Sequence, residues 1–274
     1  MENKKMNILV FVADMPYARP ALIFGRLIAR LTQSPVTLLH VNPHQSNLTR
    51  GAGILARAHE MLPDVVINTQ IRQDTPTSGI LEEIHTGKYD LVVLRARRKL
   101  WLTQRFRGVV GRMIAKHAPV SVLIVKRDSP DLKRILVCTG GVDIAETAIK
   151  AGAQLAQAAH ARATLLYVTN PLPSMYTGLN GIEETLPELL QTNTPVARHL
   201  RHAAEILAQH QVSAELELRR GVVSNEILRE ADRGNYDLII VGASRVANGL
   251  KGWVLGDVTW QVVNEARCPV LVVR

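Results

Sequence analysis

Short apolar runs rich in β-branched residues alternate along this chain with longer stretches of helical periodicity. In the first 126 residues the apolar runs predict strands at 7–12, 35–41, 64–71, 90–94 and 121–125. The helical periodicity covers 18–33, 76–87 and 104–117. Strands that alternate with helices favour a parallel sheet covered by helices, with any ligand site outside the carboxyl ends of the strands. Two helices end at Gly87 and Gly234, which we expect in the C′ position that glycine favours.

The chain contains an internal repeat. Segments 7–10 and 36–41 recur 127 residues later, and segments 80–94 and 121–126 recur 147 and 148 residues later. The change of offset predicts an insertion of about twenty residues at 170–193, around Tyr176, where proline and glycine are typical of a loop. The insertion is a candidate recognition loop. We therefore predict a first domain at 1–126, a linker at 127–132 and a second domain at 133–274.

Small residues recur on the first long helix of each copy. In the first copy they are Ala21, Gly25 and Ala29, and in the second Ala148, Gly152 and Ala156. A spacing of four residues places them on one helix face, so we expect both helices to pack closely on the sheet.

The charge is concentrated in the first copy. The chain of 274 residues has a net charge of +9, and residues 1–130 hold 19 Lys and Arg against 9 Asp and Glu. The stretch Arg95–Lys116 contains no acidic residue and includes Trp101 and Phe106. Such a stretch predicts a polyanion or nucleic-acid site, for which stacking rings would be useful. Its candidate anion-binding residues are Arg95, Arg97, Arg98, Arg105 and Arg107. The alternatives are a solvated face, or pairing with Glu215 and Glu217.

Several classes of function are disfavoured. No apolar run is long enough to span a bilayer, and Met1–Met6 is polar, so we expect a cytoplasmic protein without membrane insertion. Cys138 and Cys268 lie outside any metal-binding pattern and are expected to be buried fillers. His199 and His202 share a helix face, which we expect to be solvated. No hydrolase or kinase motif is present, so we predict no enzyme, no catalytic residue and no metal site.

The two YDL segments, at 89–91 and 236–238, and the final GDVTWQVVNEARCPVLVVR resemble the universal stress protein family in tandem form. APVSVLIVK at 118–126 carries the same resemblance. The resemblance implies an α/β fold: two tandem doubly wound, five-stranded parallel-sheet domains of the Rossmann-like, adenine nucleotide alpha hydrolase-like type. It also implies that the domains pair through their fifth strands, 121–126 and 269–274, as an intramolecular pseudo-dimer. A homodimer of the whole chain is a further expectation.

Nucleotide-binding members of this family carry a G-x2-G-x9-G-[ST] loop after the fourth strand and an aspartate after the first. In the second copy Gly242 and Gly256 match the outer glycines, one residue too far apart, and Gly140 stands at the aspartate. Asp257 replaces the Ser or Thr, as the helix N-cap or a partner of the helix dipole. There it would repel a phosphate unless a metal, Arg245 or Lys251 intervened. The candidate nucleotide-binding residues are Thr139, Gly140, Val168, Gly242, Ser244, Gly256, Asp257 and Val258.

The first copy matches that motif less well. Counting back from Gly108 places Arg95 and Arg98 at the other two glycines, and Ala13 stands at the aspartate. The leading interpretation is a non-enzymatic stress-response protein that contacts an unknown protein partner, with nucleotide binding weakened or lost and no fixed cofactor. One alternative is a switch in the second domain that binds ATP or another adenine nucleotide, with Mg²⁺ for a triphosphate. The other is polyanion or nucleic-acid binding through Arg95–Lys116.

Overall fold

The computed structural model describes residues 5–42, 48–96, 109–128, 131–140, 145–169, 185–245 and 253–274. The elements of the first half are β1 (Ile8–Phe11), α1 (Arg19–Thr32), β2 (Val36–Asn42), α2 (Leu48–Glu60), β3 (Ile67–Gln73), α3 (Pro76–Thr86), β4 (Leu91–Arg95), α4 (Val109–His117) and β5 (Ser121–Val125). The five predicted strands are confirmed. Helix α2 is not among the predicted helices. Of the helix predicted at 104–117, residues 104–108 lie outside the described residues and the rest forms α4.

The second half repeats this order with additions. Its elements are β6 (Arg134–Thr139), α5 (Ala145–Ala159), β7 (Arg162–Thr169), α6 (Leu186–Gln191), α7 (Pro195–Gln209), β8 (Ala214–Arg220), α8 (Val223–Arg233), β9 (Leu238–Gly242), β10 (Ser244–Arg245), β11 (Trp253–Val254), α9 (Asp257–Glu265) and β12 (Val270–Val273). Helix α6 lies in the predicted insertion, while 170–184, with Tyr176, lies outside the described residues.

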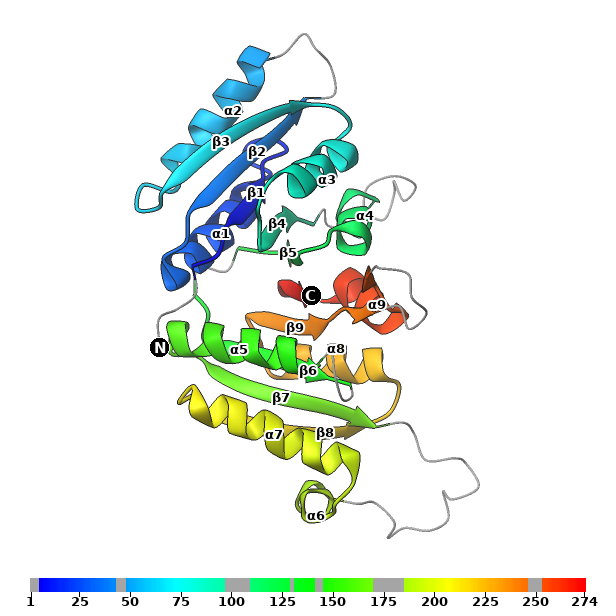
Figure 1. Cartoon of the computed structure of the whole chain (residues 1–274). Coiled ribbons are helices and arrows are strands. Elements are labelled where there is room, and N and C mark those ends of the chain that lie inside the picture. Colours follow the sequence, from blue (N-terminus) through cyan, green and yellow to red (C-terminus); the bar gives the residue numbers. More distant parts are fainter. Residues whose placement is uncertain are drawn as a thin grey trace.

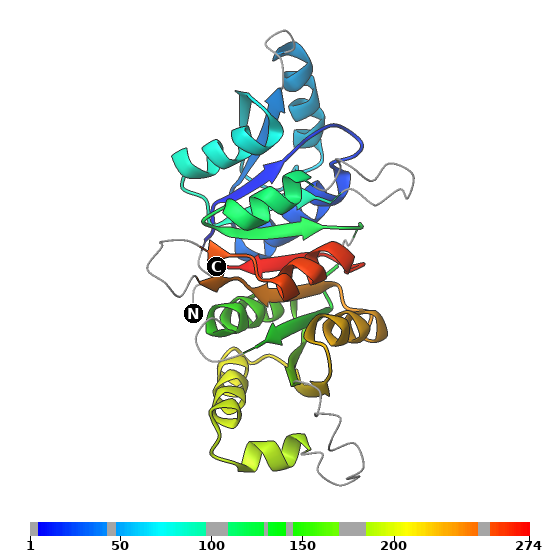
Figure 2. The ribbon, with the colours of Figure 1, turned by 90° about the vertical axis from the view of Figure 1, so that its right-hand side faces the viewer.

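One ten-stranded sheet runs through the molecule, in the order β3-β2-β1-β4-β5-β12-β9-β6-β7-β8 (Figure 1). In this sheet all strand pairs within each half are parallel, whereas β5 and β12 pair antiparallel at the centre. In this seam Leu123 lies opposite Leu271, and Ile124 opposite Val270. The predicted pairing of the fifth strands is therefore confirmed, and each apolar edge is covered by the other (Figure 2).

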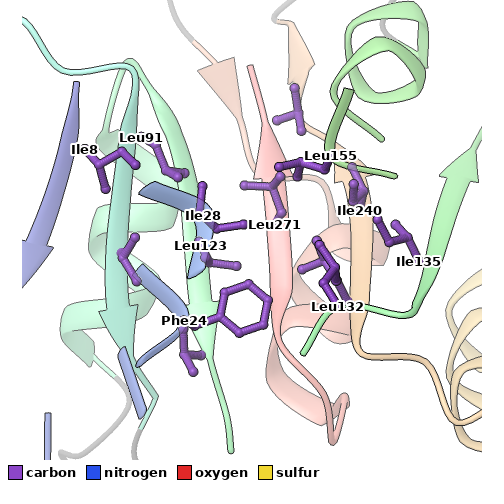
Figure 3. Close-up of a cluster of buried hydrophobic side chains, with 14 of the residues drawn as sticks. Ile8, Phe24, Ile28, Leu91, Leu123, Leu132, Ile135, Leu155, Ile240 and Leu271 are labelled. Atoms are coloured by element: carbon purple, nitrogen blue, oxygen red, sulfur yellow. The ribbon is translucent and has the colours of Figure 1, made fainter. Parts of the chain in front are cut away.

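Alternation of side chains along the strands divides the core between the two faces of the sheet. Buried residues of α1, α2, α5 and α7 pack on one face, and those of α3, α4, α8 and α9 pack on the other. The first cluster crosses the seam: Figure 3 shows Ile28 and Leu123 of the first half beside Leu271 of the second. The two halves therefore share their core rather than touching at a polar boundary.

The small residues act as predicted. A Cβ added to Gly25 would lie 2.9 Å from Val10 Cγ2, and one added to Gly152 would lie 2.5 Å from Val137 Cγ2. Because Val10 and Val137 are equivalent residues of β1 and β6, both copies use the same close approach of helix to sheet.

Gly87 and Gly234 end their helices as predicted, but not in the predicted conformation. Each is the C-cap residue, with φ of −91° and −84°, so neither uses the left-handed region. Glycine is needed for another reason: an added Cβ would collide with the ring of Tyr89 or Tyr236. The C′ prediction is therefore wrong, since side-chain crowding rather than backbone conformation selects glycine here.

In each half this tyrosine donates a hydrogen bond to a buried glutamate. Tyr89 Oη donates to Glu83 Oε1 at 2.7 Å, and Arg72 Nε donates to Glu83 Oε2 at 2.6 Å. Burial raises the pKa of Tyr89 to about 12. In the second half the same bonds join Tyr236, Glu230 and Arg219. The network ties each outer strand, β3 or β8, to the helix that follows it, which gives the YDL tyrosines a structural role.

The YDL aspartates are also structural. Asp90 Oδ2 accepts from the backbone N–H of Asn7 at 2.9 Å. Asp237 Oδ2 accepts from the N–H groups of Lys133 and Arg134 at 2.9 and 3.0 Å. In both halves this aspartate therefore fixes the start of the first strand beside the fourth.

Two cations cross the seam reciprocally. Lys126, after β5, donates from Nζ to Val263 O and Asn264 O at 2.5 and 3.3 Å, at the end of α9. Arg274, after β12, donates from its guanidinium to Ala115 O and Ala118 O, at the end of α4. Each half therefore supplies a cation to the C-terminal carbonyls of the other half's last helix, where positive charge is favourable.

Candidate functional site

The candidate site of the second half lies where the strand order reverses. From β6 the chain proceeds outward through β7 to β8, then returns to place β9 on the other side of β6. Such reversal points are where open α/β sheets bind ligands. Gly140 follows β6 and Gly242 ends β9, so the parallel pairing of these strands brings both glycines to the same edge of the sheet.

Helix α9 begins at this edge. Its N-cap is Gly256, in extended conformation with φ −63° and ψ 158°, without a side-chain cap. Asp257 is the first helical residue, exposed, in the turn that favours an anion. The dipole interpretation of Asp257 is thus confirmed, and the N-cap interpretation is wrong. Thr259 Oγ1 donates to Gly242 O at 3.2 Å, which joins the helix to the end of β9.

Between Gly242 and α9 the chain forms a small hairpin. Ser244 of β10 pairs with Val254 of β11, and Arg245 pairs with Trp253. Residues 246–252, which include Val246 and Lys251, lie outside the described residues. The loop from Gly242 to Gly256, which is one residue longer than in the family motif, therefore contains a short antiparallel strand pair.

Thr139 faces a buried histidine. Its hydroxyl lies 2.6 Å from Nε2 of His199, and both side chains are buried. The prediction that His199 is solvated is wrong, because its helix turns this position into the core; His202, three residues later, is more than half exposed. Burial lowers the pKa of His199, His202 lowers it further, and Glu146 opposes the shift. The Thr139 hydroxyl is therefore already hydrogen-bonded to the protein.

The remaining predicted nucleotide-binding residues differ in solvent exposure. Val168 is buried near the end of β7, whereas Gly140 and Val258 are exposed. Glycines at a sheet edge beside a helix N-terminus can approach an anion with backbone N–H groups. The described site thus combines glycine backbone at the sheet edge with a helix N-terminus whose first turn holds the carboxylate of Asp257.

The basic stretch of the first half is described only in part. Arg95, at the end of β4, donates from Nη1 to Val125 O at 3.1 Å and lies 6.0 Å from the ring centre of Tyr17. Arg97, Arg98, Arg105 and Arg107 lie outside the described residues, so their anion-binding role stays a prediction.

The alternative pairing of the basic stretch with Glu215 and Glu217 also stays a prediction, because residues 97–108 of that stretch lie outside the described residues. Glu217 forms an ion pair of 3.0 Å with Arg219 of its own strand. Both glutamates lie on β8, the outermost strand of the second half, at the end of the sheet remote from the first half.

Both cysteines lie in the described part of the chain. Cys138 and Cys268 are free and buried, as predicted, and burial raises the pKa of Cys268 to about 11. Among the described residues, no group of three His, Cys, Asp or Glu side chains is arranged to hold a metal ion. None of the described helices is long and apolar enough to cross a membrane.

The fold defines a class: two tandem, doubly wound α/β units joined into one sheet, each with a reversal of strand order of the kind at which such sheets bind ligands. The profile of the universal stress protein family matches residues 5–126 and again 131–274. The chain therefore belongs to the universal stress protein family, in tandem form.

Relatives agree with this assignment. A universal stress protein of Methanocaldococcus jannaschii is 30% identical over 151 residues, 55% of this chain and 87% of that protein. One of Bacillus subtilis is 32% identical over 146 residues, 52% of this chain and 98% of that protein. Among solved structures, a functionally unknown protein from Pseudomonas aeruginosa superposes with a TM-score of 0.73 at 20% identity, over 99% of this chain and 93% of that one. Membership of the family supports a role in stress response.

Proposed function

We propose that this protein is a non-enzymatic, cytoplasmic stress-response protein that acts by contacting a protein partner, with adenine-nucleotide binding weakened or lost. In this proposal the two units are 1–126 and 133–274, joined by 127–132. The observation that carries it is Asp257 in the first turn of α9. This turn is where a bound phosphate would be stabilised, and the protein's own carboxylate already occupies it.

The chemistry around Asp257 supports weak binding. A phosphate at the N-terminus of α9 would meet a like charge, and Thr139 already uses its hydroxyl in a bond with His199. Two unit charges about 4 Å apart in water repel enough to weaken binding about fivefold, and more in a partly enclosed site.

The test begins with mass spectrometry of small molecules released from the denatured, purified protein, followed by ATP and ADP titrations with and without Mg²⁺. We expect an empty protein that does not bind at millimolar nucleotide. Asp257→Ser should tighten binding at least about fivefold. Asp232→Ser, which removes an exposed carboxylate near the end of α8, is the matched control and should change nothing. A stoichiometric adenine nucleotide in the wild type would refute the proposal.

The second candidate is an adenine-nucleotide switch in the second half. It is favoured by Gly140, Gly242 and Gly256 at the strand reversal and the start of α9. Tight binding that requires Mg²⁺ and is weakened by Asp257→Ser would support it, because a cation held between phosphate and carboxylate turns their repulsion into a shared attraction.

A further inference from the structure

The seam has approximate twofold symmetry in sequence as well as in space. Leu123 and Leu271, which lie opposite each other, are also equivalent residues of the repeat, 148 positions apart. Arg112 of α4 and Trp260 of α9 are separated by the same 148 positions. The Arg112 guanidinium carbon lies 4.8 Å from the centre of the Trp260 ring. Residues at equivalent positions therefore meet across the seam, where two identical halves would present the same residue twice.

Most residues of the seam are of the same chemical type in both halves, so they do not determine which half pairs with which. The facing strands are apolar in both halves. Lys126 and Arg274 are both cations, and each reaches the end of the other half's last helix. Two first halves from different copies could form the same strand pairing and the same helix caps.

Helices α4 and α9, which flank the seam (Figures 1 and 2), differ in charge. Helix α4 carries Arg112 and Lys116 and no acidic residue, whereas α9 carries Asp257 and Glu265 and no basic residue. If two first halves paired, Arg112 would face a second Arg112. A guanidinium is attracted to an aromatic ring and repelled by another guanidinium.

We propose that the Arg112–Trp260 contact specifies the seam: it favours pairing of the first half with the second and rejects pairing of α4 with the α4 of a second copy. The partner that this surface fits is one with an aromatic ring opposite Arg112 and a negative neighbouring helix, which the second half supplies. The inference is independent of whether the protein binds nucleotide.

A residue exchange in the full chain tests this proposal. Four chains are compared by urea unfolding: wild type, Arg112→Trp, Trp260→Arg and the double exchange. Trp260→Arg places two arginines in contact and should have the lowest midpoint. The double exchange restores one arginine and one tryptophan, and it should recover at least half of that loss. The coupling expected from the contact is a factor of about two to five in the unfolding equilibrium constant.

The control is Arg267→Trp, which replaces an arginine that is 82% exposed and lies 3.6 Å from Asp232. It measures the general effect of the Arg→Trp change, which we expect to be small. If the stability lost by the double exchange equals the sum of the stabilities lost by the two single variants, the two residues are not coupled and the proposal is wrong.

A second measurement covers the case in which Trp260→Arg does not fold. Wild type and Arg112→Trp are refolded at low and high protein concentration, and the dimeric fraction is measured by sedimentation. Arg112→Trp removes the repulsion between two first halves, so its dimeric fraction at high concentration should exceed that of the wild type. Equal dimeric fractions in the two proteins would overturn the proposal.

Discussion

Arg274 offers a quantitative test of how the halves hold together. Its guanidinium donates to two carbonyls at the end of α4, and burial lowers its pKa to about 10. A hydrogen bond from a charged donor contributes about 1.5–3 kcal/mol, and a cation at a helix C-terminus about 0.3–1 kcal/mol. The cost of burying the charge offsets part of this gain. We expect Arg274→Met to lower the free energy of unfolding by about 2 kcal/mol.

Urea unfolding, followed by circular dichroism, measures this change. With a slope of about 3 kcal/mol/M, the midpoint should fall by about 0.7 M. Arg267→Met is the matched control, because its side chain is 82% exposed, and it should stay within about 0.5 kcal/mol of the wild type. Lys126→Met removes the reciprocal cap and should act in the same direction. An Arg274→Met midpoint as high as that of Arg267→Met would refute the idea that the crossing cations stabilise the seam.

Two further predictions concern buried positions. Because the folded pKa of His199 is lowered, the unfolded chain takes up its proton first on acidification; stability should be full above the unfolded pKa and fall as the pH drops toward the folded value. His199→Gln should remove most of the change in urea midpoint between pH 7 and pH 5, whereas His202→Gln should remove only the smaller part that comes from the charge of His202. An unchanged pH dependence in His199→Gln would contradict this assignment. Gly25→Ala should cost about 1–3 kcal/mol by crowding Val10, whereas Gly53→Ala, with no atom within 4 Å of the new Cβ, should be neutral or stabilising in thermal melts. Equal melting temperatures for the two alanine variants would show that α1 can move away from the sheet.

The sequence predicts the sheet well because its evidence is periodic and repeated. Apolar runs mark the strands, the offset between copies identifies equivalent positions, and Gly25 and Gly152 fall where the helices touch the sheet. The site is harder to predict. The bond between Thr139 and His199 joins residues 60 positions apart, and no local pattern indicates it.

Local rules also mislead where a tertiary contact competes with them. Gly87 satisfies the rule for a helix-ending glycine, yet the ring of Tyr89 is what excludes a side chain there. Helix α2 was not predicted from its pattern, although Ile54, Leu55 and Ala58 are buried in it. These three residues follow helical spacing, so the sequence does contain the periodic signal for this helix.

The antiparallel seam has a geometric consequence for any ligand. Because β5 and β12 run in opposite directions, the parallel strands of the two halves also run in opposite directions. The carboxyl ends of the strands, where a ligand would bind, therefore lie on opposite edges of the sheet in the two halves. A single small molecule therefore cannot bridge the two edges. A macromolecule that binds both edges must extend across the sheet from one edge to the other.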